Sequence, residues 1–535
     1  MAGKGPSSSI ATPSLDLSLQ TAEQSVDDEP TLWKSIRKWP KVVGYSLGLA
    51  SAILLNGFDT SIVGNLSAIP AFQEDYGRHF NNRYIIPSTW MGLWTAIGTL
   101  GTMTGSVVAG WLQDRVGRRP ALALGSLLSA VGVAIIYCSH FLDALDSRRG
   151  TFLAGKFVQG VAVGTLLCST QTYLSEILPP KLRGSVMAFF PVFTLVGQLI
   201  GAVVVSASLK YPHNQPYTTP MIAQWPFSAV PLILALLVPE SPTYLLRKRK
   251  YDQAFKAQKR LDSSRTDTQK NIDDLMFSLQ KEEEQARHRQ VTYMECFQGT
   301  NRRRTLIVIF ANVLPMLFGF SLLGDSTYFI QIVGMSAKNA LLFLQLGVGL
   351  GLLANIVSMW AVTKIGRRVL GMASLIVSTV LWLGMGIAGC FDGVVVIWYT
   401  AVTMMVVVVA VGVAIWPVSV VVSAETSSLR LRAKTQGIGW FSGALAQGAF
   451  GISLPYVYNV DQGDLRAKAG FIIAGFSGIA SVLTWLFVPE MKERTAAEID
   501  TMFEHRLPAR KFKEWRGTIA EVAADDSLGS HADLA

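Results

Sequence analysis

The chain has 535 residues, of which 50% are hydrophobic and 16% are charged, and its mean hydropathy is +0.36. This balance excludes an ordinary soluble globular protein, because a soluble surface of this extent needs more charged residues. The formal net charge of +10 does not indicate binding to nucleic acid, since the basic residues lie in loops between long apolar segments. Apolar segments of about 20 residues match the hydrocarbon thickness of a bilayer, so the composition predicts a multi-pass membrane protein.

Twelve apolar segments follow one another along the chain and predict twelve transmembrane helices. The first six are expected at residues 43–63, 88–111, 120–139, 151–172, 187–207 and 222–238. The second six are expected at residues 304–323, 338–360, 369–389, 396–422, 436–457 and 469–488. The predicted regions are a disordered N-terminal tail, a six-helix bundle, a charged linker with short helices, a second six-helix bundle and a C-terminal tail, at residues 1–41, 42–239, 240–303, 304–489 and 490–535.

The charged loops predict the orientation of the helices. Basic residues gather in the loops on one face, at Lys34–Lys41, Arg115–Arg119, Arg247–Lys250, Arg302–Arg304 and Lys364–Arg368. By the positive-inside rule this face is expected in the cytoplasm, together with both termini, and we expect the plasma membrane as the location. The linker lies on the same face, and two of its segments are expected as short solvated helices, Tyr251–Lys259 and Lys281–Arg289.

An internal repeat divides the chain into two similar halves. Three features of the first half recur 249 residues later, and a fourth recurs 250 residues later. In chain order, the recurring features are Gly117-Arg118-Arg119 with Gly366-Arg367-Arg368, Glu176 with Glu425, Arg183 with Arg432, and Pro239-Glu240 with Pro489-Glu490. The predicted fold class is therefore an all-α membrane protein of two pseudo-symmetric six-helix bundles. Transporters built from such repeats bind their cargo near the bilayer midplane, between the repeats.

The residues around these repeats also resemble a known family. Sequences similar to the loop signatures of sugar porters, a family of the major facilitator superfamily, occur at Gly110–Arg119, Ser175–Gly184, Pro239–Pro242 and Pro489–Thr495. Sequences most similar to fungal α-glucoside (maltose-type) permeases within that family occur at Gly57–Thr60, Gly324–Phe329, Ser428–Thr435 and Phe503–Phe512. The resemblance covers about residues 40–515 and implies the major facilitator fold.

Two charged residues, Asp59 and Lys156, fall inside apolar segments of the first half. An ionised side chain in a bilayer is costly unless it is paired or faces water, so both residues are candidates for function. The resemblance implies that they are a proton-coupling pair, in which the carboxyl group senses the proton and the base couples it to closure. Lysine stands where the family usually has arginine, and the pKa of lysine changes more readily. The alternative is a static ion pair that only fixes helix packing.

A second set of charged residues lies at the cytoplasmic ends of the predicted helices. Partly buried pairs of arginine and carboxylate there are expected to latch the outward-facing state and to release in the inward-facing state. The candidates for this inner gate are Asp114, Arg115, Arg118, Arg119, Glu176, Arg183, Arg367, Arg368, Glu425 and Arg432. Thr363 stands where the repeat would place a second Asp114, so the latch of the second half is expected to be weaker. The alternative is that the arginines only set the membrane topology.

The candidates for binding cargo are Gln198, Ser321, Asp325, Trp416 and Trp440. The resemblance implies that Gln198 contacts a sugar, because it matches the glutamine of the fifth helix in the family. Aromatic residues offer sugars a stacking surface, although core packing is the alternative for each of them.

The second half departs from the family pattern in its polar positions. Pro315-Met316 and Trp440-Phe441 replace polar pairs, which predicts a cavity more apolar than a hexose site. Asp325 is a second acid in the region of an apolar segment, and the longer first loop makes it the repeat mate of Asp59. The alternative places Asp325 at the external end of its helix, in water.

These patterns predict a proton symporter that imports a sugar or glucoside by alternating access. Its partners are then a small-molecule cargo, a proton and the lipid bilayer. We expect neither an enzyme nor a cofactor or metal site, because the six histidines are scattered and no phosphate-binding glycine loop occurs. One alternative is an exporter or facilitator of a non-sugar or glycosylated secondary metabolite. Another is a non-transporting sugar sensor, although such sensors usually carry a longer C-terminal extension.

Overall fold

The computed structural model describes residues 37, 39–80, 83–178, 190–262, 267–287, 292–428, 431–492, 494 and 496–515. Several expected features lie outside the described residues: Arg183, most of the N-terminal tail, residues 187–189 of the fifth helix and residues 516–535. The described part is mainly α-helical, and it has one short antiparallel hairpin, β1 (Arg78–Phe80) and β2 (Arg83–Ile85).

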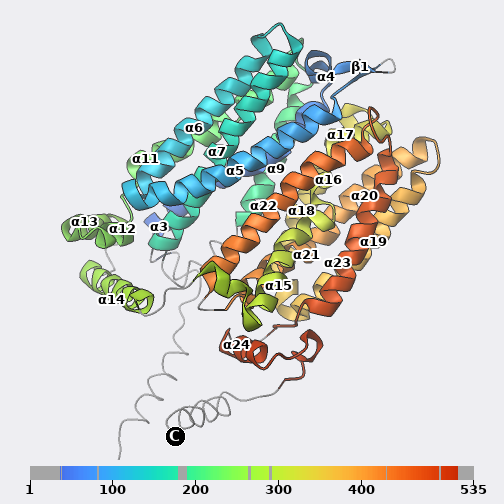
Figure 1. Cartoon of the computed structure of the whole chain (residues 1–535). Helices are drawn as coiled ribbons and strands as arrows, with labels where there is room; N and C mark the ends of the chain where they lie inside the picture. Colours follow the sequence, from blue (N-terminus) through green and yellow to red (C-terminus); the bar gives the residue numbers. More distant parts are fainter. Residues whose placement is uncertain are drawn as a thin grey trace, which may run out of the picture.

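The first half contains six long helical segments, in blue to green in Figure 1. They are α3 (Pro40–Ser67), α5 (Ser88–Val116), α6 (Arg118–Cys138), α7 (Leu145–Ile177), α9 (Phe190–Ser208), and the pair α10 (Gln215–Ile222) and α11 (Trp225–Leu237). A short helix, α4 (Pro70–Tyr76), and a 3₁₀ turn, η1 (Ser139–Phe141), lie between them at one end.

The second half lies beside the first, in yellow to red in Figure 1. Its helices are α15 (Gly299–Leu317), α16 (Phe320–Gly324), α17 (Ser326–Val333), α18 (Ala337–Ile365), α19 (Arg367–Ala388), α20 (Val394–Val413), α21 (Ile415–Thr426), α22 (Arg432–Tyr458) and α23 (Ala469–Phe487), with the turn η3 (Arg466–Lys468) before α23. The two halves meet where α5 packs against α22 and where α9 packs against α18.

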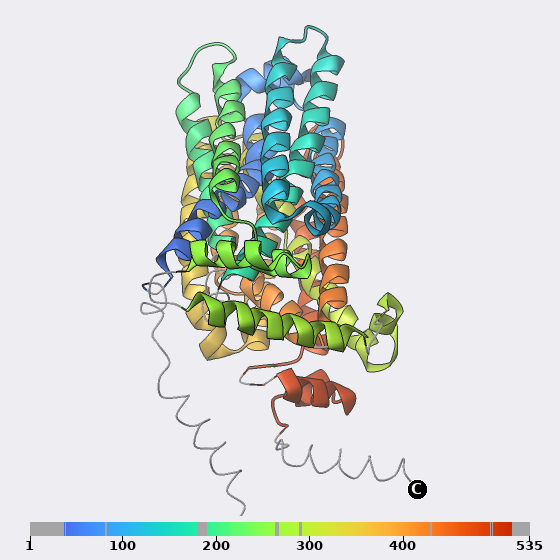
Figure 2. The ribbon, with the colours of Figure 1, turned by 90° about the vertical axis from the view of Figure 1, so that its left-hand side faces the viewer.

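Short helices mark one face of the molecule, which we call the linker face. They are α12 (Pro242–Arg247), α13 (Tyr251–Leu261), α14 (Thr268–Arg287), η2 (Tyr293–Phe297), α24 (Ala496–Glu504) and η4 (Ala509–Lys511). Figure 2 shows α13 and α14 lying across the lower ends of the long helices. The helix expected at Lys281–Arg289 in fact begins at Thr268, because the apolar residues Ile272 and Leu275 pack against α12 and α13. We call the opposite face, with α4 and the β1–β2 hairpin, the far face.

The lengths and composition of the helices confirm a multi-pass membrane protein. In the described part, nine helical segments are long and apolar enough to cross a bilayer, at residues 40–67, 118–141, 145–177, 190–208, 215–237, 337–362, 367–388, 394–426 and 466–487. The three other expected positions are occupied by α5, α15 and α22. Since α22 packs against both α5 and α15, these helices turn much of their surface to protein and can carry more small and polar residues.

The internal repeat is confirmed in the helix boundaries. Helix α18 begins 249 residues after α5 (337 − 88), and α19 begins 249 residues after α6 (367 − 118). The pair α20–α21 begins and ends 249 residues after α7. Two helices are continuous in the first half but interrupted in the second: Gly319, with φ of +97°, ends α15, and Ala414, with φ of −132°, separates α20 from α21.

Small residues allow α5 and α7 to pack with their backbones in contact. A Cβ atom at Gly105 of α5 would lie 2.1 Å from the carbonyl oxygen of Val161 in α7. A Cβ atom at Gly164 of α7 would lie 2.2 Å from the carbonyl oxygen of Thr102 in α5. Such close approach is a main source of attraction between helices in membranes, because lipid is as apolar as the side chains.

We therefore expect Gly105→Ala to destabilise the first half, since overpacking at a close backbone contact costs about 1–3 kcal/mol. The matched control in the same helix is Gly110→Ala, because a Cβ atom at Gly110 meets nothing within 4 Å. The measurement is the melting temperature of the full chain in detergent, followed by size-exclusion chromatography. Equal melting temperatures for the two variants would contradict this account of the packing.

Candidate functional site

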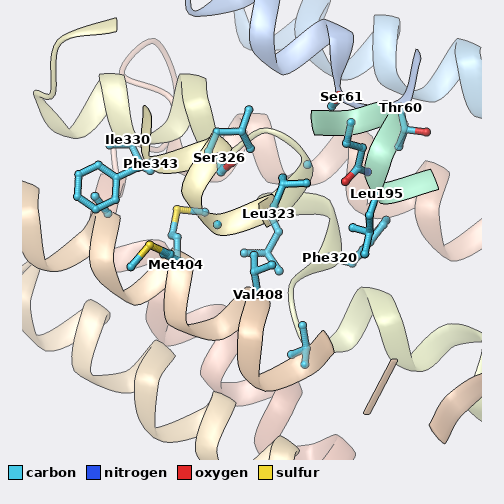
Figure 3. Close-up of a pocket in the computed structure, with 18 of the residues that line it drawn as sticks. Thr60, Ser61, Leu195, Phe320, Leu323, Ser326, Ile330, Phe343, Met404 and Val408 are labelled. Carbon is cyan, nitrogen blue, oxygen red and sulfur yellow. The ribbon is translucent and has the colours of Figure 1, made fainter. Parts of the chain in front are cut away.

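A pocket lies between the two halves, about midway along the helices. The first half contributes α3 and α9, and the second half contributes α16, α17, α18, α20 and α21 (Figure 3). Its lining residues include Thr60, Ser61, Leu195, Gln198, Phe320, Leu323, Ser326, Ile330, Phe343, Met404, Met405, Val408 and Trp416. A site shared by two repeats is where a transporter of this architecture holds its cargo.

The helix interruptions of the second half shape this pocket. Residue Gly319 adopts a left-handed backbone conformation, which suits glycine, and it starts the short helix α16 that carries Phe320 into the wall. The interruption at Ala414 is followed by Trp416, whose ring lies 5.2 Å from that of Phe320 in an edge-to-face arrangement. Both breaks therefore place aromatic residues at the pocket.

The two walls of the pocket differ in chemistry. The first half supplies hydroxyl and carboxamide groups from Thr60, Ser61 and Gln198. The second half supplies mainly aromatic, aliphatic and thioether side chains, among them Phe343 and Met404. The pocket thus offers hydrogen bonds on one side and an apolar surface on the other.

The structure separates the five residues expected to bind cargo. Gln198 and Trp416 line the pocket. Ser321 lies on α16, and Asp325 lies at the junction of α16 and α17, but neither lines the pocket. Trp440 is 66% exposed on α22 and also lies outside the lining. The sequence analysis missed the wall from α18 and α20, because nothing in the apolar pattern of those helices shows which face turns inward.

Asp59 and Lys156 form an ion pair beside the pocket. The Lys156 Nζ atom lies 2.7 Å from Asp59 Oδ1, and the two side chains are 3% and 12% exposed. Asp59 belongs to α3 and directly precedes the lining residue Thr60, while Lys156 reaches it from α7. The geometry brings the two residues together, and it is compatible with both proton coupling and a static pair.

At the linker face, arginines and carboxylates pair within each half. Arg118 binds Glu176 through two nitrogens, at 2.8 to 3.1 Å, and its guanidinium lies 3.8 Å from the exposed Asp114. Arg367 makes a single hydrogen bond of 2.9 Å to Glu425. The remaining candidates contact their own half: Arg115 lies over the Trp111 ring, Arg119 and Arg368 donate to the carbonyl groups of Ala235 and Trp485, and Arg432 donates to that of Ala424.

Two glutamates that the sequence analysis left without a role complete these clusters. Glu240 accepts hydrogen bonds from the backbone N–H groups of Arg118 and Arg119 at the start of α6. Glu490 does the same for Arg367 and Arg368 at the start of α19. A carboxylate at a helix N-terminus satisfies free N–H groups and opposes the positive end of the helix dipole. The recurrence of Pro-Glu in the sequence was the available signal for this role.

The far face is closed by hydrogen bonds between the two halves. Asp461, in the loop after α22, accepts hydrogen bonds from the Ser88 N–H at 3.0 Å, from the Ser88 hydroxyl group and from Arg78. Ser88 is the first residue of α5, and the preceding Pro87 cannot cap the helix, so the second half caps a helix of the first. Further cross-half pairs are Asn459 with Ile86, Tyr328 with Ile86, Thr327 with Asn65, and Gln73 with Gln331.

The distribution of these contacts defines the state of the molecule. The hydrogen bonds found between the halves involve residues near the far ends of their helices, including one from Gln345 to the Ala202 carbonyl group. Within the described residues, no ion pair or side-chain hydrogen bond joins the two bundles at the linker face. This structure is therefore closed at the far face and unlatched at the linker face.

Comparison with known proteins gives a consistent result. The family described as sugar (and other) transporter matches residues 46–503. The MFS transporter fmqE of Aspergillus fumigatus is 30% identical over 512 residues, which cover 93% of each chain. Maltose permease MAL61 of Saccharomyces cerevisiae is 30% identical over 513 residues, covering 93% of this chain and 82% of the permease.

Solved structures show the same fold. The inward-open xylose transporter XylE from E. coli superimposes with a TM-score of 0.67 at 19% identity, covering 86% of this chain and 99% of that chain. The proton:xylose symporter XylE bound to 6-bromo-6-deoxy-D-glucose gives a TM-score of 0.66 at 19% identity, covering 87% and 100%. At this level of identity, the likeness confirms the major facilitator fold and carries no information on cargo.

The cap from Asp461 predicts how the far face opens. We expect Asp461→Ala to shift the protein towards a state open at the far face by roughly tenfold or more, because charge-assisted hydrogen bonds are worth about 1.5–3 kcal/mol. Spin labels at Asp143→Cys and Asp392→Cys, exposed positions of the two halves on this face, measure the separation in a chain whose four native cysteines are serine.

The matched control is Asp464→Ala. Asp464 is 48% exposed, and its carboxylate pairs with Arg466 of its own half, so its loss should leave the distance distribution unchanged. If Asp461→Ala also leaves the distribution unchanged, Asp461 does not hold the far face closed.

Proposed function

The chain belongs to the sugar transporter family of the major facilitator superfamily, and from this premise we propose that it moves a sugar or glucoside across a membrane by alternating access, coupled to a proton. The observation that carries the proposal is the pocket between the halves, which borders the Asp59–Lys156 pair. The far face is closed over it, and the linker face is unlatched. An arrangement in which one face is closed at a time is what alternating access requires.

Asp59 and Lys156 are the proposed coupling pair. A proton on the Asp59 carboxyl group removes its charge and so breaks the ion pair of 2.7 Å in a poorly solvated place. The freed lysine then changes the packing of α7 against α3, next to Thr60 and Ser61 of the pocket wall. Cargo and proton thus act on the same stretch of α3.

The charged clusters of the linker face are the proposed inner gate. Arg118 with Glu176 and Arg367 with Glu425 stay within their own halves here, as expected for a state that is open at this face. Closure would bring the two clusters towards each other. The single hydrogen bond of Arg367 to Glu425 leaves the second cluster with the weaker pairing.

The linker face is the proposed cytoplasmic face, and the plasma membrane is the proposed location. The loops at this face carry the basic clusters Arg115–Arg119, Arg247–Lys250 and Lys364–Arg368. In this orientation the structure corresponds to an inward-facing state. Partners of the protein are then the cargo, the proton and the surrounding lipid.

Uptake measurements in a transport-null yeast test the proposal. We expect glucose, maltose or an aryl glucoside to enter cells expressing the full chain, and a protonophore to abolish this uptake. Asp59→Asn removes the titrating group and should reduce concentrative uptake at least tenfold, whereas Asp464→Asn should not change it. Absence of uptake of every sugar, by protein shown to reach the cell surface, would refute sugar import.

A second candidate function is transport of an amphipathic metabolite that is not a simple sugar. The observation that favours it is the apolar second wall, with Phe320, Phe343 and Trp416 near Met404. Aromatic and thioether side chains suit a flat apolar group, and sugar hydroxyl groups gain little from them. One of the relatives is described only as an MFS transporter, with no sugar in its name.

A variant of the apolar wall separates the two candidates. We expect Trp416→Leu to weaken binding of an aryl glucoside about two- to tenfold, because aromatic pairing is worth about 0.5–1.5 kcal/mol beyond burial. Binding of maltose should change less. Gln198→Ala should weaken both ligands alike. Affinities measured on purified protein decide this, and an equal loss for both ligands in Trp416→Leu would show that the apolar wall does not discriminate.

A further inference from the structure

Asp325 is a buried acid that the site described above does not use. It lies between α16 and α17 and is 9% exposed. Within the described residues, its carboxyl group makes no ion pair and no hydrogen bond. An ionised carboxylate in such a place is costly, whereas the neutral acid is tolerated.

The repeat makes Asp325 the counterpart of Asp59. Each acid lies eight residues before the last residue of its helix, Ser67 in α3 and Val333 in α17 (67 − 59 and 333 − 325). The partner of Asp59 is Lys156, and the repeat offset of 249 places Met405 at the equivalent position of the second half. The second half therefore keeps the acid but lacks the base that would neutralise it.

The packing around Asp325 depends on the far face being closed. A Cβ atom at Gly64 of α3 would lie 2.9 Å from Asp325 Oδ1 and 2.8 Å from its Cα atom, so the two halves touch at the acid. Thr327 and Asn65 form a cross-half hydrogen bond of 2.9 Å next to it. Separation of the halves at the far face would expose this side chain to water.

The groups around the junction provide no positive charge. The phenols of Tyr328 and Tyr458 are close and uncharged. On α3 the nearest acid is Asp59, which Lys156 neutralises. Helix α20 contains no lysine, arginine or acid, α15 has its arginines at the linker face, and α22 has its basic residues there too. The remaining charges near the far face are exposed or paired: Lys338 of α18, Arg466 with Asp464, and Arg78 with Asp461.

We propose that Asp325 is a second proton-binding group, which is protonated when the far face closes and ionised when that face is open to water. Protons then favour the closed far face, and their loss favours opening. The inference adds a second proton site to the proposed symport and rests on it for its role in transport. It concerns only the conformational equilibrium, so it is testable without knowing the cargo.

The test measures the spin-label distance between Asp143→Cys and Asp392→Cys in nanodiscs from about pH 5 to about pH 8.5. One group that binds a proton only in the closed state changes the ratio of closed to open molecules by up to about tenfold per pH unit. We expect this dependence in the parent chain and in Asp59→Asn. Asp325→Asn stays neutral at every pH, so it should remain closed and lose the dependence.

The control and the outcomes separate this inference from the proposed function. Glu74→Gln, an exposed acid of α4, should retain the pH dependence of the parent chain. Dependence that persists in Asp325→Asn overturns the inference and leaves symport through Asp59 intact. A distance in the parent chain that does not change with pH also overturns it, even if Asp325→Asn fails to fold. Loss of sugar uptake with the expected distances would refute sugar import alone.

Discussion

The cost of placing charge in a poorly solvated interior is the constraint on which the rest of this structure depends. Asp59 is stable inside the first bundle because Lys156 lies 2.7 Å away, and Arg118 is buried because Glu176 accepts two of its nitrogens. Other charged groups lie at the helix ends, where water or a helix dipole compensates them. Any movement of the halves must exchange one set of compensating partners for another, and this exchange links conformation to protons.

The two repeats divide the work unequally although they share helix boundaries to the residue. The first half has continuous helices at α3 and α7, an acid with its base, and the polar side of the pocket. The second half has interrupted helices at Gly319 and Ala414, an acid without a base, and the apolar side. The asymmetry therefore lies in local backbone and side-chain choices, while the architecture remains symmetric.

The sequence was sufficient for the features that depend on local pattern. Apolar length located the helices, and the offset of 249 residues located the repeat and the pairing of Arg118 with Glu176 in one cluster. Features that depend on tertiary contacts were not predictable in this way. The cap that Asp461 provides for Ser88 joins residues far apart in the chain, and the lining from α18 and α20 depends on helix rotation. Trp440 was expected at the cargo, yet it lies outside the pocket lining because sequence position alone does not fix the direction of its face.

The confinement of the interrupted helices to one half has an evolutionary consequence. Substitutions around α16 or in α18 and α20 reshape the apolar wall, and none of them touches the ion pair in the first bundle. Selection on the nutrient or metabolite being moved can therefore act on one repeat, while selection on the energy source acts on the other. A lineage with this arrangement is able to diversify its cargo quickly and to inherit its coupling machinery unchanged.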